Sequence, residues 1–124
     1  MKISNEQIKE FKELGYLFIE NVFDEEEVKT MTKELPDLYN MDRKEVQREK
    51  NGKAVRTIFA AHKFNTICEK ISRHPRIVNP AKQLLGGDVY IHQFKINAKA
   101  AFDGDLWQWH QDYGTWKRDD GMPE

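Results

Sequence analysis

Hydrophobic residues recur at helical spacing near the start of the chain. Ser4, followed three residues later by Gln7, has the form of a capping box, in which each side chain bonds the other residue's backbone N–H. Gly15 is a typical helix stop, because glycine readily adopts the left-handed conformation that ends helices. The pattern predicts a helix between these signals, with an apolar side made of Ile8, Phe11 and Leu14.

A second capping box, Asp24 with Glu27, precedes a second helical run. We expect this helix to break or kink near Pro36, because proline lacks a backbone N–H and clashes with the preceding turn. Its apolar positions are Val28, Met31, Leu35 and Leu38. Between the two helices, residues 16–22 (YLFIENV) predict a short strand.

The middle of the chain mixes strand and helix patterns. Residues 42–53 are highly charged and contain the turn signal Asn51-Gly52, which indicates a solvated loop or a hairpin. The next segments predict a strand and then two helices, the second ended by Gly86-Gly87. These segments are residues 54–62 (AVRTIFAAH), 64–73 and 75–85.

The last third of the chain predicts two strands. Residues 89–100 (VYIHQFKINAKA) form the first, residues 102–105 (FDGD) a turn, and residues 106–116 (LWQWHQDYGTW) the second. A helix-rich part thus precedes a strand-rich part, an order that favours an α+β domain. We expect residues 1–124 to form a single domain, with a helix-rich part at 1–87 and the later strands at 88–124.

Composition excludes several function classes. The net charge of -1 gives no basic excess for binding nucleic acid. No apolar run approaches the ~20 residues that cross a bilayer, and the N-terminus lacks the apolar core of a secretory signal. We therefore expect a cytoplasmic protein with no membrane partner. The single cysteine, Cys68, allows neither an intrachain disulfide nor a cysteine-based zinc site, and it is expected to be a small buried hydrophobe.

Candidate chemistry concentrates in the segment WQWHQDYGTW, which holds every tryptophan of the chain. If this segment is a strand, His110 and Asp112 project from the same face, close enough to share a divalent metal. A His-x-Asp pair supplies two ligands of the 2-His-1-carboxylate triad of non-haem Fe(II) oxygenases. The pair alone also fits a surface histidine near a turn aspartate, and tryptophans on a strand are usually core residues.

The preceding predicted strand strengthens the metal interpretation. One of its faces is entirely polar, as expected for the wall of a cavity that recognises a polar ligand, although a sheet face in solvent looks the same. That polar face consists of Gln93, Lys95, Asn97 and Lys99. The other face carries Phe94 and Ile96, so His92 is interpreted as a core histidine. His74 is expected at a helix end, and His62 is undecided.

The stretch YIHQFKINAKAAFDGDLWQWHQDYGTWKRDDGMPE resembles the phytanoyl-CoA dioxygenase family, most closely its ectoine-hydroxylase-like branch. The resemblance is specific over residues 89–124 and extends more loosely to AVRTIFAAH and to residues 6–28. It implies an Fe(II)- and 2-oxoglutarate-dependent oxygenase. It also implies a double-stranded β-helix (jelly-roll, cupin-like) core behind N-terminal helices.

The resemblance also implies roles for individual residues. His110 and Asp112 match the first two iron ligands. Asn97 matches a residue that contacts 2-oxoglutarate, and Trp107 matches an aromatic position beside this cosubstrate. Gln93 and Trp116 match positions that line the pocket for the primary substrate, and Lys99 could pair with a carboxylate. Iron, 2-oxoglutarate and O₂ together would hydroxylate an unactivated C–H bond of a small molecule, with succinate and CO₂ as coproducts.

The sequence departs from the family pattern in one respect. The family's second iron-binding histidine and the arginine that clamps 2-oxoglutarate lie further downstream than Glu124. We therefore expect an incomplete domain that is inactive alone. Two alternatives stay open: a non-catalytic fragment or interaction module that pairs through exposed sheet edges, including self-association, and a site for another divalent metal. The sequence does not identify the substrate.

Overall fold

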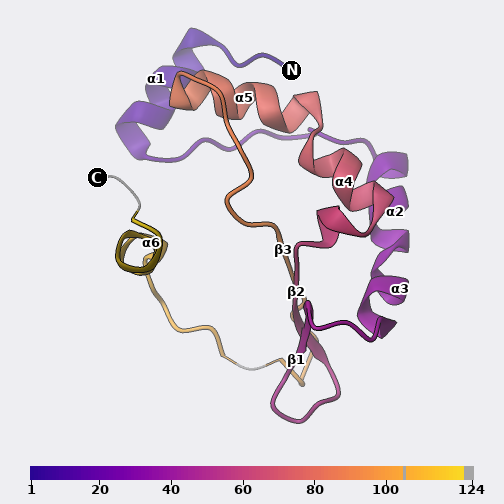
Figure 1. Ribbon diagram of the computed structural model, residues 1–124. Helices are drawn as coiled ribbons and strands as arrows, with labels where there is room; N and C mark the ends of the chain where they lie inside the picture. The colour runs from indigo at the N-terminus through magenta and orange to yellow at the C-terminus, as the bar shows by residue number, and fades with distance from the viewer. Residues whose placement is uncertain (105, 122–124) are drawn as a thin grey trace.

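The computed structural model describes residues 1–104 and 106–121, apart from the side chain of residue 115, as a mixed arrangement of helices and one sheet (Figure 1). Three helices come first: α1 (Asn5–Leu14), α2 (Glu25–Lys33) and α3 (Leu35–Asn40). The strands are β1 (Val46–Arg48), β2 (Val55–Phe59) and β3 (Lys95–Asn97). The remaining elements are the short 3₁₀ helix η1 (Ala61–Lys63), α4 (Thr66–Ser72), α5 (Pro75–Leu85) and α6 (Asp112–Asp120).

Both predicted capping boxes are confirmed. The Ser4 hydroxyl accepts a bond from the Gln7 amide at 3.2 Å, and the Gln7 side chain returns one to Ser4 at 2.9 Å. Asp24 and Glu27 make the same exchange at 2.8 and 2.9 Å. Pro36 divides the second helical run at the first turn of α3, as expected from its missing N–H.

The predicted strand at residues 16–22 is wrong. The segment is irregular and turns at Glu20 and Asn21. Tyr16 and Phe18 are 63% and 75% exposed. Apolar residues favour a strand only where a neighbouring strand and a core face can receive them, and this segment crosses the surface between two helices instead.

The strands form a sheet of order β1-β2-β3 with antiparallel neighbours. β1 and β2 form a hairpin whose turn contains Asn51-Gly52, which confirms the hairpin alternative for residues 42–53. β2 is the central strand, and Ile58 on it is fully buried. In the view of Figure 1 the strands lie between α6 on one side and α2, α3 and α4 on the other.

The hydrophobic core joins the sheet to α3, η1 and α4. Phe94 and Ile96 pack against it, as predicted from their alternation with the polar face. Cys68 is buried there, as expected, and burial raises the pKa of its thiol, with the charge of Glu34 adding to the effect. The buried members of the core are Leu38, Val46, Val55, Ile58, Ala61 and Cys68.

The two C-terminal strand predictions need correction. Of residues 89–100, only Lys95–Asn97 is regular strand, because β2 offers a partner for three residues and the chain leaves it at Ala60 in a left-handed conformation. Residues 106–111 are irregular, and Asp112 begins α6. The acidic residue in the first turn of α6 and the basic residues in its last turn interact favourably with the helix dipole. These interactions favour a helix over the strand that the alternating pattern predicts.

None of the helices in the described ranges is long and apolar enough to span a membrane.

Candidate functional site

His110 and Asp112 come together where the irregular segment 106–111 meets α6. Nε2 of His110 lies 3.3 Å from Oδ1 of Asp112. The expected proximity is therefore confirmed, whereas the shared strand that was expected to produce it is absent. The short separation arises at the helix start, where the chain changes from an extended to a helical conformation between these residues.

A backbone carbonyl sets the tautomer of His110. Nδ1 of the ring lies 2.6 Å from the carbonyl oxygen of Gln108. Because a carbonyl can only accept, Nδ1 carries the hydrogen, and Nε2 is left to face the Asp112 carboxylate. Metal-binding histidines are typically held in this way by a hydrogen bond from the other ring nitrogen.

Two electron-rich atoms at this separation favour a cation between them. A proton on Nε2 would give an ion pair, and a divalent metal would be held by an imidazole nitrogen and a carboxylate oxygen. Two ligands about 2.1 Å from one ion at a right angle lie about 3 Å apart, close to the observed separation. The side chains are 58% and 64% exposed, so ligands can reach them. Within residues 1–104 and 106–121, no group of three potential metal ligands occurs.

A cavity of about 510 Å³ adjoins this pair. Asp112 lines it together with Gln93, Lys95 and Trp116. Apolar residues such as Ile77 and Ile91 form much of the remaining wall. The structure therefore brings both residues matched to a substrate pocket, Gln93 and Trp116, beside one of the two candidate metal ligands. An apolar cavity with a few convergent polar groups is typical of small-molecule sites.

His92 also lines this cavity, so its interpretation as a core histidine is wrong. The residue is exposed, and its Nε2 lies 3.5 Å from Oδ2 of Asp120 on α6. Its ring meets the Trp116 ring edge-on at 5.1 Å between centroids. Alternation assigned His92 to the core, but alternation holds only within a regular strand, and β3 begins after His92.

The two residues matched to 2-oxoglutarate lie away from this cavity in the described part of the chain. Asn97 on β3 accepts a hydrogen bond from the Thr57 hydroxyl at 3.1 Å. Trp107 places its ring 4.2 Å from the guanidinium carbon of Arg56 on β2. The Lys99 ammonium donates to the carbonyl of Gly104 at 3.4 Å.

The remaining histidines have structural surroundings. His74 caps α5, as expected, and its Nδ1 accepts a bond from the Arg76 amide at 3.2 Å. His62 lies in η1 with its ring 5.1 Å from that of Phe94. Its Nδ1 is buried and has no hydrogen-bond partner among the described residues.

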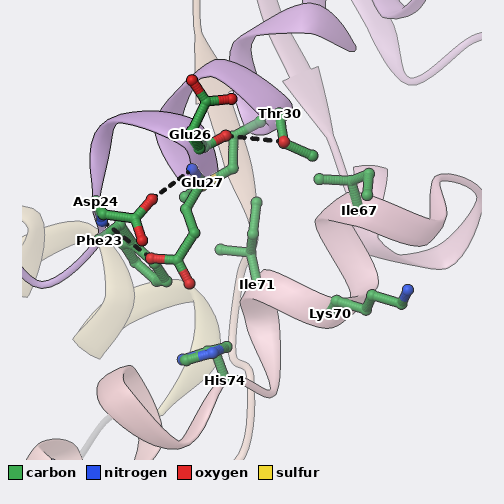
Figure 2. Close-up of a pocket in the computed structure, with 10 residues that line it drawn as sticks. Phe23, Asp24, Glu26, Glu27, Thr30, Ile67, Lys70, Ile71 and His74 are labelled. Atoms are coloured by element: carbon green, nitrogen blue, oxygen red, sulfur yellow. Dashed lines mark hydrogen bonds between the residues drawn. The ribbon is translucent and has the colours of Figure 1, made fainter.

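A second cavity, of about 350 Å³, lies between α2 and α4 (Figure 2). Two of its carboxylates stabilise the helices around it. Asp24 caps α2, and Glu27 pairs with Arg76 of α5. The hydrogen bond from Arg76 is the main reason why the pKa of Glu27 is lowered. His74 meets the Phe23 ring edge-on at 5.2 Å. These contacts make the cavity a feature of helix packing.

Two residues at the site were not singled out from the sequence. Lys95 was grouped only with the polar face of its strand, although its ammonium lies 5.8 Å from the Trp116 ring centroid. The sequence indicates no role for Arg56. The available signal was a charged residue inside a largely buried strand, VRTIF.

Comparisons with known proteins agree with the geometry. The family model described as Phytanoyl-CoA dioxygenase (PhyH) matches residues 11–124. The ectoine dioxygenase of Bordetella parapertussis is 37% identical over 98% of this chain and 41% of its own length. The L-proline trans-4-hydroxylase of Streptomyces griseoviridis is 37% identical over 87% of this chain and 40% of its own length. The chain thus spans about two fifths of these relatives.

Solved structures give the same result. The crystal structure of EctD from S. alaskensis with 2-oxoglutarate and 5-hydroxyectoine matches with a TM-score of 0.89 and 33% identity, over 98% of this chain and 44% of that one. The structure of the same protein with bound Fe matches with a TM-score of 0.84 and 31% identity, over 92% of this chain and 42% of that one.

Proposed function

Because this chain belongs to the phytanoyl-CoA dioxygenase family, we propose that it forms part of an Fe(II)- and 2-oxoglutarate-dependent dioxygenase that hydroxylates a small organic substrate. The observation that carries the proposal is the arrangement of His110, whose Nδ1 is bound to a carbonyl while Nε2 lies 3.3 Å from Asp112. A neutral imidazole nitrogen and a carboxylate oxygen are two of the three donors that hold Fe(II) in non-haem oxygenases.

In this proposal His110 and Asp112 hold the iron. The metal, when bound with 2-oxoglutarate and O₂, supplies the oxidising power for C–H hydroxylation. The protein's own residues bind and orient the cosubstrate and the primary substrate. Trp107 and Asn97 form the cosubstrate side, and Gln93 with Trp116 contacts the primary substrate. The Trp116 ring lines the cavity beside Asp112.

The relatives and the cavity support a compact polar molecule as the substrate in this proposal. The named relatives act on ectoine and L-proline, both compact ring compounds. A cavity of about 510 Å³ with an amide, an ammonium and a tryptophan ring fits a polar molecule of this size. We extend the proposal to the fold: residues 1–124 form one domain in which 1–87 supplies the helices and 88–124 the first iron-site segments. The sheet is then part of a jelly-roll core.

Metal binding by paired variants tests the proposal. Anaerobic titration of the chain with Fe(II) in the presence of 2-oxoglutarate should give a complex that His110→Ala and Asp112→Asn each weaken by at least about tenfold. Asp120→Asn is the matched control, because Asp120 belongs to the other His–Asp pair, with His92 at 3.5 Å. Equal Fe(II) affinity in wild type, His110→Ala and Asp112→Asn would overturn the proposal.

A second candidate is an interaction module without catalysis. Large apolar side chains in the segment that leads to His110 are exposed: Phe102 and Trp109 fully, and Leu106 to 83%. Exposed apolar groups so close together favour contact with another polypeptide, here a second copy of the chain.

A further inference from the structure

The segment that carries His110 has no helix or strand of its own to hold it in place. Residues 106–111 have no regular secondary structure, and Trp109 in the middle of them is fully exposed. Trp107, by contrast, is 43% exposed, because one face of its ring lies on the Arg56 guanidinium at 4.2 Å. Arg56 comes from β2, the central strand, so the contact ties the segment to the middle of the sheet.

Arg56 is itself held in place by a buried carboxylate. Its Nη1 donates to Oε2 of Glu49 at 3.0 Å. The Glu49 side chain is only 4% exposed and that of Arg56 is 29% exposed. Leaving a carboxylate so buried without this cation would be costly, so the ion pair favours the position of the guanidinium beside it. The Glu49 amide also bonds the Ala54 carbonyl at 2.8 Å, which fixes Glu49 within the hairpin.

We propose that Arg56, held by Glu49, is a positioning residue: through the Trp107 ring it fixes the segment that presents His110 to Asp112. His110 lies three residues beyond Trp107, about 10 Å of extended chain, so fixing the ring restricts where the imidazole can lie. On the far side of the pair, Trp116 contacts His92 and Lys95. His110 and Asp112 thus lie in the sequence between two tryptophans, each of which contacts another part of the fold. The metal part of this inference rests on the proposed function, whereas the docking part does not.

The chain contains a matched control for this arrangement. Arg43 places its guanidinium carbon 4.2 Å from the centroid of the Phe64 ring, the same distance as Arg56 from Trp107. It is also ion-paired, to Glu45 at 3.3 Å. Arg43→Gln therefore removes a cation–π contact and an ion pair of the same kind without touching Trp107.

Two measurements on Arg56→Gln, Arg56→Lys and Arg43→Gln test the inference. The first is the ¹⁵N heteronuclear NOE of the Trp107 indole N–H, assigned with Trp107→Phe. The second is Mn(II) affinity, from the loss of the free Mn(II) EPR signal during titration, which can be followed in every variant. Arg56→Gln should lower the NOE of Trp107 but not that of Trp109. It should weaken Mn(II) binding about two- to fivefold, the factor that one partly exposed cation–π contact is worth.

Arg56→Lys keeps a positive charge near Glu49 and the ring, and it should restore most of both readouts. Arg43→Gln should change neither, even though it lowers stability. Wild-type values of the Trp107 NOE and of Mn(II) affinity in a folded Arg56→Gln protein would overturn the inference, as would an equal loss in Arg43→Gln. Failure of the proposed function appears differently: wild type would then bind Mn(II) no better than His110→Ala, while the NOE still decides whether Arg56 holds Trp107.

Discussion

The guanidinium of Arg76 on α5 is paired with the carboxylate of Glu27 on α2, across 49 residues of sequence. Arg76 also donates to the Val22 carbonyl at 2.8 Å and lies 4.8 Å from the Phe23 ring centroid. One side chain therefore connects α5 to α2 and to the chain that leads into α2.

This ion pair predicts a pH dependence of stability. The hydrogen bond from Arg76 lowers the pKa of Glu27 in the folded chain below its ordinary value of 4.5. A lowered folded pKa means that the contribution to stability is complete above the unfolded pKa and is lost as pH falls through the folded pKa. We expect the Tm of wild type to fall below pH 4.5 more steeply than that of Glu27→Gln.

Glutamine can still accept the capping-box bond from the Asp24 amide through its one side-chain oxygen. Glu27→Gln therefore keeps the cap and removes the charged acceptor that Arg76 binds. Glu26→Gln is the control, because Glu26 pairs with Lys29 at 3.7 Å on the exposed side of the same helix. Thermal unfolding followed by circular dichroism between pH 3 and 7 measures all three. Parallel Tm curves for wild type and Glu27→Gln would contradict the assignment.

Burial in the core predicts that two isoleucines differ in their contribution to the free energy of unfolding. Ile58 is fully buried on β2, whereas Ile77 on α5 is 41% exposed. Ile58→Ala should lower the free energy of unfolding by about 2–5 kcal/mol, because it removes packed methylene groups and leaves a cavity. Ile77→Ala should cost less than about 1 kcal/mol. Urea denaturation measures both, and similar losses would mean that the sheet is not the centre of the core.

Turnover provides a third prediction. His110 and Asp112 are joined by no third metal ligand within residues 1–104 and 106–121. We expect the 124-residue chain alone, given Fe(II), ascorbate and 2-oxoglutarate, to release succinate no faster than its His110→Ala variant. Release well above that variant would mean that the third ligand comes from another histidine of this chain or from a second copy.

Association is the fourth prediction. If the exposed apolar groups near the site contact another copy, Leu106→Ser with Trp109→Ser should shift the chain toward monomer. Phe18→Ser should not, although Phe18 is 75% exposed, because it lies in the segment between α1 and α2. Sedimentation velocity over a range of concentrations distinguishes these outcomes. A wild-type chain that stays monomeric throughout would exclude the second candidate function.

Features determined by neighbouring residues could be predicted from the sequence. The capping boxes at Ser4 and Asp24 depend on residues three apart, and the helix stop at Gly86 depends on one glycine with φ 71°. The face carried by Phe94 and Ile96 was also correct, because alternation and burial agree there. The roles of Asn97, Trp107, Gln93 and Trp116 remain proposals.

Features determined by distant partners could not be predicted in this way. Residues 16–22 and 106–111 have strand-like composition but no neighbouring strand within the described chain. His92 was misassigned for the same reason, since it precedes the three residues that pair with β2. The docking of Trp107 on Arg56 joins residues about 50 positions apart, and no local pattern encodes such a contact.

The sheet topology has a consequence for the order of folding. β1 and β2 meet through a local hairpin, whereas the bond between Thr57 and Asn97 closes a loop of 40 residues that contains α4 and α5. Closing the longer loop costs more chain entropy, so β3 is expected to dock after the hairpin has formed. Pulse-labelled hydrogen exchange would then protect the Phe59 amide, which bonds Glu45, before the Ala98 amide, which bonds Arg56. The strand that carries Asn97 would join the fold among its last steps.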